Sequence, residues 1–219
     1  MLHRIVFLVV AVSTVGCAAR LEGELDGRTV PTFQTAAFGA FSASPSGYSV
    51  MGFFSAGNSC DDGADLTRAQ RRWSTAFDVD ERQARAERWA ELINERLPER
   101  SWYGQLSLFA ADDDDLDDAE VDLSEQRDVF LSGFQLCQRS GDAIAVDGII
   151  QTGDDCYIAI DGDIDITRND QETELTLVSE RTIEFIDETG DEEGDLTISI
   201  TMTECEPLSE EVEATVSPS

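Results

Sequence analysis

The final third of the chain alternates apolar and polar residues with a period of two. Leucine, isoleucine or methionine occupies positions 196, 198, 200 and 202, and threonine or serine occupies the odd positions between them. Successive side chains of a β-strand point to opposite faces of a sheet, so residues 196–203 are predicted to form a strand with one buried face.

The same alternation appears in the segments that precede this strand. Isoleucines at 158, 160, 164 and 166 alternate with aspartates at 161, 163 and 165, and shorter apolar pairs follow at 175/177 and 183/185. The acidic, glycine-containing segment 187–195 is typical of a hairpin turn between the last two strands. This part of the chain is therefore predicted to be a run of antiparallel strands.

Strand patterns also occupy the first half of the chain. Segments 33–41 and 48–55 flank a Ser-Pro-Ser-Gly turn cluster, which predicts a hairpin. In 102–109 the residues expected on one face are Trp102, Leu106 and Leu108, and in 130–136 they are Phe130, Phe134 and Leu136. The predicted fold class is mainly β, an antiparallel sandwich or barrel with a helical insertion.

The helical insertion is expected at about 66–97. Leu66, Ala69, Trp73 and Phe77 recur at helical spacing, and a second helix is predicted after Asp80, with a capping box to Gln83. Trp89, Leu92, Ile93 and Leu97 form the apolar stripe of that helix, and Pro98 ends it. The other faces carry arginines, which we expect to pair with nearby carboxylates such as Glu81 and Glu87 or to lie against the acidic sheet, an external anionic ligand being the alternative: Arg68, Arg71, Arg72, Arg82, Arg85 and Arg88.

The first sixteen residues have the organisation of a secretory signal peptide. Arg4 precedes an apolar run at 5–12, which is too short to span a membrane, and small residues follow. The stretch Thr14-Val15-Gly16-Cys17 resembles the lipobox of bacterial lipoproteins. That resemblance implies a mature chain that begins at Cys17 and is anchored through acyl chains on it. Ordinary cleavage near Ala18 or Ala19, with Cys17 discarded, is the alternative.

The residue after the lipobox cysteine bears on localisation. Ala18 does not resemble the aspartate that retains such lipoproteins in the inner membrane, so the resemblance implies an outer-membrane lipoprotein of the cell envelope, on its periplasmic or surface face. The expected organisation is a signal peptide at 1–16, a lipidated tether at 17–30, a single β-rich domain at 31–205 and a disordered acidic tail at 206–219.

Four cysteines remain once Cys17 is assigned to lipid: Cys60, Cys137, Cys156 and Cys205. An even number in an exported chain predicts two disulfides. Four cysteines permit three pairings, among which we favour Cys137 with Cys156 and Cys60 with Cys205. None forms a CxxC pair and the only histidine is His3, so we expect no structural metal site.

Charge and composition exclude several functions. The chain has 46 acidic residues and 15 basic residues, all of them arginine, for a formal net charge of −31. This charge excludes a nucleic-acid partner. The mature chain would lack both histidine and lysine, which excludes Ser-His-Asp and Schiff-base chemistry, and no glycine-rich phosphate-binding motif is present. We therefore expect no cofactor and assign no catalytic residue.

A calcium site is the remaining motif to consider. Asp161, Asp163, Asp165, Asn169 and Glu172 match five ligand positions of an EF-hand loop, but Ile166 stands where that loop requires glycine. The alternation described above favours a strand, with the aspartates in a row on its exposed face.

Beyond the lipobox, three stretches look like a loose group of uncharacterised small proteobacterial lipoproteins: residues 21–28, the strand that ends at Cys60, and the closing strand that ends at Cys205. The resemblance implies a disulfide-bearing β-domain. The function predicted is a non-enzymatic envelope lipoprotein that binds a partner or contributes structure, the expected partner being cationic or bridged by divalent ions. A carboxylate-dependent glycan hydrolase and a calcium-stabilised adhesion domain are the alternatives.

Overall fold

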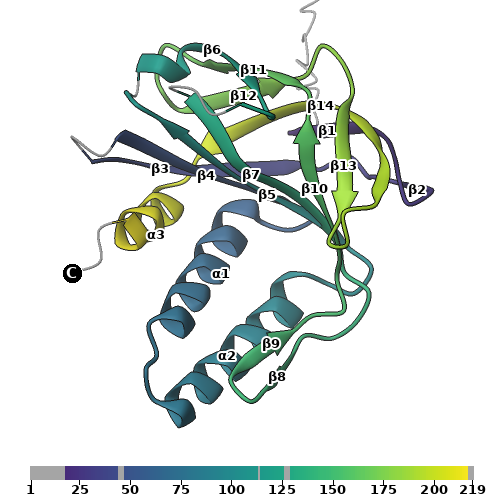
Figure 1. The fold of residues 1–219 in the computed structure, drawn as a ribbon. Helices are drawn as coiled ribbons and strands as arrows, with labels where there is room; N and C mark the ends of the chain where they lie inside the picture. Colours follow the sequence, from purple (N-terminus) through teal and green to yellow (C-terminus); the bar gives the residue numbers. More distant parts are fainter. Residues whose placement is uncertain (1–17, 44–46, 113, 126–128, 217–219) are drawn as a thin grey trace, which may run out of the picture.

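The computed structural model describes residues 18–43, 47–112, 114–125 and 129–216, and lipobox residues 14–17 lie outside them. A twelve-stranded sheet and three α-helices make up most of the fold, as the mainly β prediction with a helical insertion requires (Figure 1). The strands of the sheet are β1 (Ala19–Leu25), β2 (Arg28–Thr29), β3 (Thr35–Ala43), β4 (Gly47–Ser55), β5 (Trp102–Ala110), β6 (Asp118–Asp122), β7 (Val129–Gln138), β10 (Asp155–Asp161), β11 (Asp163–Arg168), β12 (Glu174–Val178), β13 (Ile183–Asp187) and β14 (Glu192–Glu204). The other elements are α1 (Ser59–Ser74), α2 (Val79–Arg96), the short helix η1 (Asp114–Leu116), the hairpin strands β8 (Ile144–Val146) and β9 (Ile149–Gln151), and α3 (Glu206–Val216).

The sheet curves until its strands close on themselves. Its order runs β13-β10-β7-β5-β4-β3-β14, and β13 also pairs with β14, so these seven strands form a closed, barrel-like ring. Strands β12, β11 and β6 continue the sheet from β14, and β1 pairs with β14 as well. All neighbours are antiparallel except β14 and β3, which are parallel over two residue pairs.

The main core fills the interior of this ring. Phe54 from β4, Phe134 from β7 and Phe185 from β13 are buried and meet edge to face, with ring centroids 6.3 Å and 5.6 Å apart along the series. Gly104 on β5 makes this packing possible, because a Cβ atom there would lie 2.0 Å from the ring of Phe54. Leu196, Ile198, Ile200 and Met202 of β14 are all buried, which confirms the alternation predicted for that strand.

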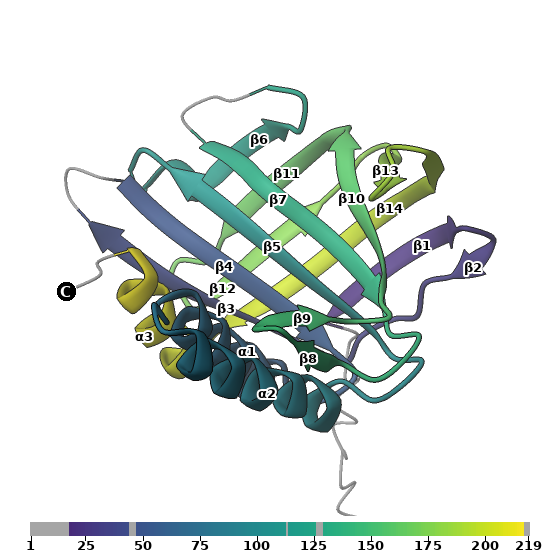
Figure 2. The same cartoon turned by 60° about the horizontal axis from the view of Figure 1, so that its bottom comes forward.

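The helices lie on the outer face of one part of the sheet. Figure 2 shows α3 beside β3, with α1 next to it and α2 beyond α1; α1 contacts β3 and β4, and α2 contacts the β8–β9 hairpin. At Gly39 on β3 a Cβ atom would lie 2.5 Å from the backbone of Leu208, so the absence of a side chain allows α3 to approach this closely. Within the described ranges, no helix combines the length and the apolar character needed to cross a bilayer.

The predicted tether at 17–30 is wrong over the residues described. Ala19–Leu25 is strand β1, which pairs with β14, and Leu21 and Leu25 point into the core with at most 2% exposure. Glutamates and a glycine between these leucines gave the segment the composition of a linker, although its two leucines lie on one face of a strand.

The predicted disordered tail at 206–219 is also wrong up to Val216. Residues 206–216 form α3, in which Leu208 and Val212 are buried at helical spacing. The acidic side chain of Glu211 is buried as well and bonds to Arg68 (2.6 Å) and Arg71 (2.8 Å) on α1. The acidic composition that suggested disorder therefore includes one carboxylate that attaches the helix.

The helical insertion begins earlier than predicted, and the residue that caps its second helix is not the predicted one. Helix α1 starts at Ser59 instead of 66, because the side chain of Asn58 caps it and its first turns are buried through polar contacts such as Ser55 Oγ to Asp62 (3.0 Å). Asp78, and not Asp80, caps α2 by accepting hydrogen bonds from the amides of residues 80 and 81. Apolar periodicity could not reveal a first turn that is buried by hydrogen bonds.

In two regions of the sheet, some side chains lie on the opposite face from the one predicted. Ile164 and Ile166 are fully buried, whereas Ile158 and Ile160 are 38% and 37% exposed. The segment is two strands, since Gly162 (φ +125°) and an irregular register after Ala159 interrupt the alternation. A similar irregularity in the pairing of β5 with β7 directs Phe130 away from the interior, where it packs on Phe109 with centroids 5.4 Å apart.

Both disulfides have the pairing favoured from the sequence. Cys137 and Cys156 are directly opposite each other on β7 and β10, and their bond joins neighbouring strands. Cys60 and Cys205 join α1 to the end of β14, immediately before α3. The second bridge therefore attaches the start of α1 to the sheet at the point where α3 begins.

The disulfides are expected to differ in their effect on stability. In the chain-entropy description, a bridge that spans 145 residues contributes about 5 kcal/mol and one that spans 19 residues about 3 kcal/mol. Replacing Cys60 and Cys205 with serine should therefore lower the free energy of unfolding more than replacing Cys137 and Cys156. Denaturant titration of the two double variants measures this, and an equal or reversed loss would contradict it.

The attachment of α3 is expected to depend on pH. Burial alone would raise the pKa of the Glu211 carboxyl, but hydrogen bonds from Arg71 and Arg68 outweigh it and hold the pKa below its ordinary value. A lowered pKa means that the stabilisation is present above the ordinary glutamate pKa and is lost as the pH falls through the folded-state value. Glu211→Gln should cost about 1.5–3 kcal/mol at neutral pH and progressively less below about pH 4.

Denaturant titration at several pH values measures this difference, and Glu213→Gln is the matched control because Glu213 is exposed on the same helix. An equal loss in both variants at neutral pH, or a deficit for Glu211→Gln that does not change with pH, would show that the ion pairs do not attach α3.

Candidate functional site

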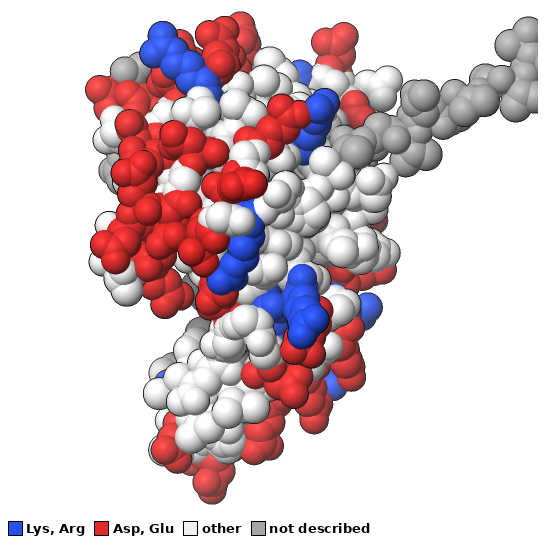
Figure 3. Space-filling model, turned by 90° about the vertical axis from the view of Figure 1, so that its right-hand side faces the viewer, with Lys and Arg blue, Asp and Glu red and all other residues white. Residues whose placement is uncertain are grey.

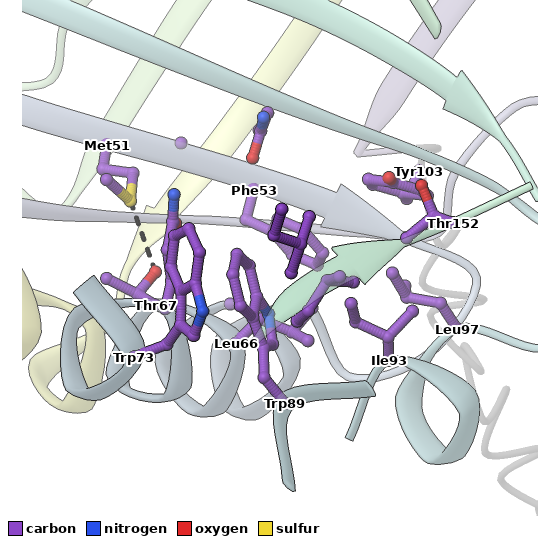
Figure 4. A pocket seen from close by; sticks show the side chains of 16 residues that line it. Met51, Phe53, Leu66, Thr67, Trp73, Trp89, Ile93, Leu97, Tyr103 and Thr152 are labelled. Carbon is purple, nitrogen blue, oxygen red and sulfur yellow. Dashed lines mark hydrogen bonds between the residues drawn. The ribbon is translucent and has the colours of Figure 1, made fainter. Parts of the chain in front are cut away.

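A mainly apolar hollow of the described chain lies between the sheet and the helical insertion. Its volume is about 340 Å³, within the range typical of small-molecule sites. Strands β4 and β5 form its floor, α1 and α2 form one side, and the β8–β9 segment closes another (Figure 4). We refer to it as the apolar pocket.

The floor consists of side chains that point outward from the ring. Along β4 and β5 the even positions face the interior, as Phe54 and Leu106 do, so the odd positions face the helices. Met51, Phe53 and Tyr103 therefore line the apolar pocket, with the rings of Phe53 and Tyr103 6.3 Å apart. Around these three residues the sheet is apolar on both faces, which is why it needs a covering layer here, whereas Gln105 and Ser107 further along β5 are polar.

The helices contribute residues that recur at helical spacing. Trp73 of α1 and Trp89 of α2 meet with ring centroids 5.2 Å apart, so aromatic rings form the wall where the helices converge. The hydroxyl of Thr67 on this wall donates a hydrogen bond to Met51 Sδ (3.4 Å), so it already has a partner within the protein. The helical lining residues are Gly63, Leu66, Thr67, Gln70, Trp73, Trp89, Ile93 and Leu97.

The β8–β9 hairpin is held against the helices by hydrogen bonds at its turn. Trp73 Nε1 donates to the carbonyl oxygen of Gly148 (2.7 Å), and the Gly148 amide donates to Gln83 Oε1 (2.6 Å). The sequence suggested that Gln83 belonged to a helix cap, whereas its side chain secures this turn. Ile149, Ile150 and Thr152 from the hairpin thus reach the pocket wall.

A buried ion pair fixes the base of the same hairpin. Arg139 and Asp154 have side chains that are each 1% exposed, with Nε and Oδ1 3.0 Å apart. Tyr103 donates its hydroxyl to Asp154 (3.1 Å), and Arg139 donates to Asn94 on α2 (2.9 Å). The network therefore ties the floor strand, the hairpin base and α2 to one another.

Burial governs the ionisation of this network. It raises the pKa of the Tyr103 phenol far above its ordinary value, and the negative charge of Asp154 acts in the same direction. Burial also raises the pKa of Asp154, against the opposing effects of Arg139 and of hydrogen bonds from Tyr103 and Thr152. At neutral pH the hydroxyl that borders the apolar pocket is therefore an uncharged group already engaged in a hydrogen bond.

The lining of the apolar pocket contains no charged residue. The 16 lining side chains include four aromatic rings, and their polar members are uncharged amides and hydroxyls. In a chain of which 28% of residues are charged, this wall is unlike the rest of the surface. It suits a ligand that is itself largely apolar, since burying a charge here without a partner would be costly.

A smaller, acidic hollow of about 310 Å³ lies near β10 and β13, and Figure 3 shows acidic side chains gathered on that side of the molecule. Arg28 contacts both Asp26 (2.8 Å) and Asp155 (2.6 Å). Asp187 accepts hydrogen bonds from the amides of Thr189 (2.8 Å) and of residue 191, which form the hairpin turn. These carboxylates have structural partners, so the hollow offers less to a ligand than the apolar pocket does.

The aspartates of the calcium motif lie along exposed strand positions. Asp163 and Asp165 are on β11, as the strand interpretation predicted, and the Asn169 side chain accepts from the amides of Thr173 (2.9 Å) and Glu174 (3.1 Å) to form the following turn. Within the ranges that the structure describes, no three His, Cys, Asp or Glu side chains are grouped so as to hold a metal ion.

Sequence reasoning identified much of the pocket lining without identifying the pocket. Leu66, Trp73, Trp89, Ile93 and Leu97 were predicted as the apolar stripes of the two helices, and the structure brings them together. The contributions of β4, β5 and the β8–β9 hairpin were missed. The stretch 50–54 of β4, in which no side chain on either face is polar, was the available signal for a second buried face.

Comparison with protein-family models, with curated proteins and with solved structures finds no match for the chain.

Proposed function

We propose that this protein is a lipid-anchored envelope protein whose β-domain is a binding module for a small, largely apolar molecule. The observation that carries the proposal is the uncharged, aromatic wall of the apolar pocket in a chain of net charge −31. Binding there removes apolar surface of the ligand from water and leaves no buried charge without a partner. The module needs no catalytic residue for this role.

The anchor in this proposal is the acylated Cys17 implied by the lipobox, at the outer membrane. Ala18 already belongs to the folded domain, since its carbonyl oxygen accepts a hydrogen bond from the Thr201 amide (2.7 Å). The acyl chains would therefore lie one residue from the sheet, and the domain would sit directly at the bilayer surface. An apolar ligand with low solubility in water would then be exchanged close to the membrane.

Ligand binding is tested with the neutral fluorescent probe N-phenyl-1-naphthylamine in equilibrium dialysis. We expect saturable binding at one site per chain. Gln70→Trp should weaken it by at least about tenfold, because Gln70 lines the pocket and the larger indole would occupy its volume.

Gln171→Trp is the matched control, since Gln171 is exposed in the turn between β11 and β12 and the same bulk is added there. Unsaturable binding, or equal affinities in the two variants, would refute the apolar pocket as the ligand site.

The lipid anchor is tested by amine labelling. The chain contains no lysine, so acylation of the Cys17 amine would leave the mature protein without a primary amine. Protein purified from host membranes should not react with an N-hydroxysuccinimide dye, whereas the same chain produced from residue 20, without its signal, should take up one dye at its terminus. Labelling of the membrane-derived protein to the same extent would count against an acylated Cys17.

A further inference from the structure

A second cavity, of about 610 Å³, lies between other faces of α1 and α2. Five arginines line it, against only two acidic residues, Asp65 and Glu95. We call it the arginine groove: Arg68 and Arg72 come from α1, and Arg85, Arg88 and Arg96 come from α2. One third of the 15 basic residues of the chain are thus gathered in one place.

Two of these arginines hold the helices to their neighbours. Arg68 bonds to the buried Glu211 (2.6 Å), and Arg96 bonds to Asp65 (2.5 Å). Their charges are therefore committed to partly buried carboxylates within the protein. The other three arginines differ in this respect.

The charges of the other three arginines, Arg72, Arg85 and Arg88, are paired more weakly within the protein. Arg85 and Arg88 form ion pairs with Glu81 and Glu91 one turn away on α2, where both partners are partly exposed. Pairs of this kind contribute a few tenths of a kcal/mol in water and exchange readily. Among the described residues, no acid lies within ion-pair distance of Arg72.

The positions of these three side chains bring positive charge together from both helices. Arg85 reaches from α2 to α1, where it donates to the main-chain oxygen of Arg72 and to Thr75 Oγ1 (3.2 Å). Arg88 lies three residues further along α2, so the two guanidinium groups occupy one side of that helix. Like charges that line one cavity repel each other, and an anion between them would relieve that repulsion.

We propose that the arginine groove binds a ligand that carries clustered phosphate groups, either free or as the headgroup of a lipid. Guanidinium groups match phosphate oxygens with paired hydrogen bonds, and a phosphate group carries enough charge to engage more than one arginine. The cavity is larger than a single phosphate requires. This site is separate from the apolar pocket, so either proposal can fail without the other.

The test uses sodium tripolyphosphate in isothermal titration calorimetry at low ionic strength, with the intact folded protein. We expect saturable binding of one ligand that weakens as salt is added. The variant Arg72→Gln/Arg88→Gln should lose at least about tenfold in affinity, because both side chains are exposed and neither holds a buried acid.

The matched control is Arg20→Gln/Arg181→Gln, which removes the same two charges from exposed positions away from the groove and should retain wild-type affinity. Glu91→Gln releases Arg88 from its ion pair and should increase affinity several-fold. Thermal melts of all variants show that the fold is retained.

A second arm distinguishes the source of the phosphate. The protein produced from residue 18, which carries no acyl chain, is floated with phosphatidylcholine vesicles that contain or lack phosphatidic acid. Binding that requires phosphatidic acid and is lost in Arg72→Gln/Arg88→Gln supports a lipid ligand. Tripolyphosphate binding without vesicle binding supports a free one. The proposal is overturned if neither probe binds saturably, or if the two double variants lose affinity equally, which would indicate a response to net charge alone.

Discussion

The arrangement of the molecule depends on one part of β4 and β5 that is apolar on both faces of the sheet. Their inward side chains, such as Phe54 and Leu106, complete the core of the ring, and their outward side chains, such as Phe53 and Tyr103, are also apolar or aromatic. A sheet of this kind is stable in water only if a second layer covers it. Helices α1 and α2 supply that layer, and the apolar pocket is the part of the interface that their side chains do not fill.

The strands that carry a single buried face were predictable from the sequence, and the deviations have local causes. Alternation along β14 gave the correct buried set because that strand has no interruption between Leu196 and Met202. Alternation through 158–166 failed because Gly162 and a register irregularity turn the chain over, which the spacing of isoleucines does not reveal. The errors at both ends of the domain share another cause. Acidic and small residues gave β1 and α3 the composition of linkers, although Leu21 and Leu25 of β1 and Leu208 and Val212 of α3 are buried.

The site was less predictable than the fold. The helical wall of the apolar pocket could be predicted from the helical spacing of apolar residues, as Trp73 and Trp89 show. The cavity itself depends on how far the helices stand from the sheet, and that distance is set by contacts between distant segments. Trp73 to Gly148 and Arg139 to Asp154 are examples, because they join α1 and the residue after β7 to the segment that contains the β8–β9 hairpin. One sequence carries no signal for such pairs.

The helical layer also has a different electrostatic character from the sheet that it covers. The chain beyond residue 100 is strongly acidic, whereas the helical insertion carries seven of the 15 arginines. Some, such as Arg68 and Arg71, point to α3 and are needed to attach it through Glu211. If the arginines of the insertion had only a structural role, the protein would need no more of them than it has carboxylates of this kind to pair. Arg72 has no acidic partner among the described residues and lies in one cavity with Arg85 and Arg88, so positive charge is concentrated there beyond what the fold needs to pair its own acids, and an anion would balance it.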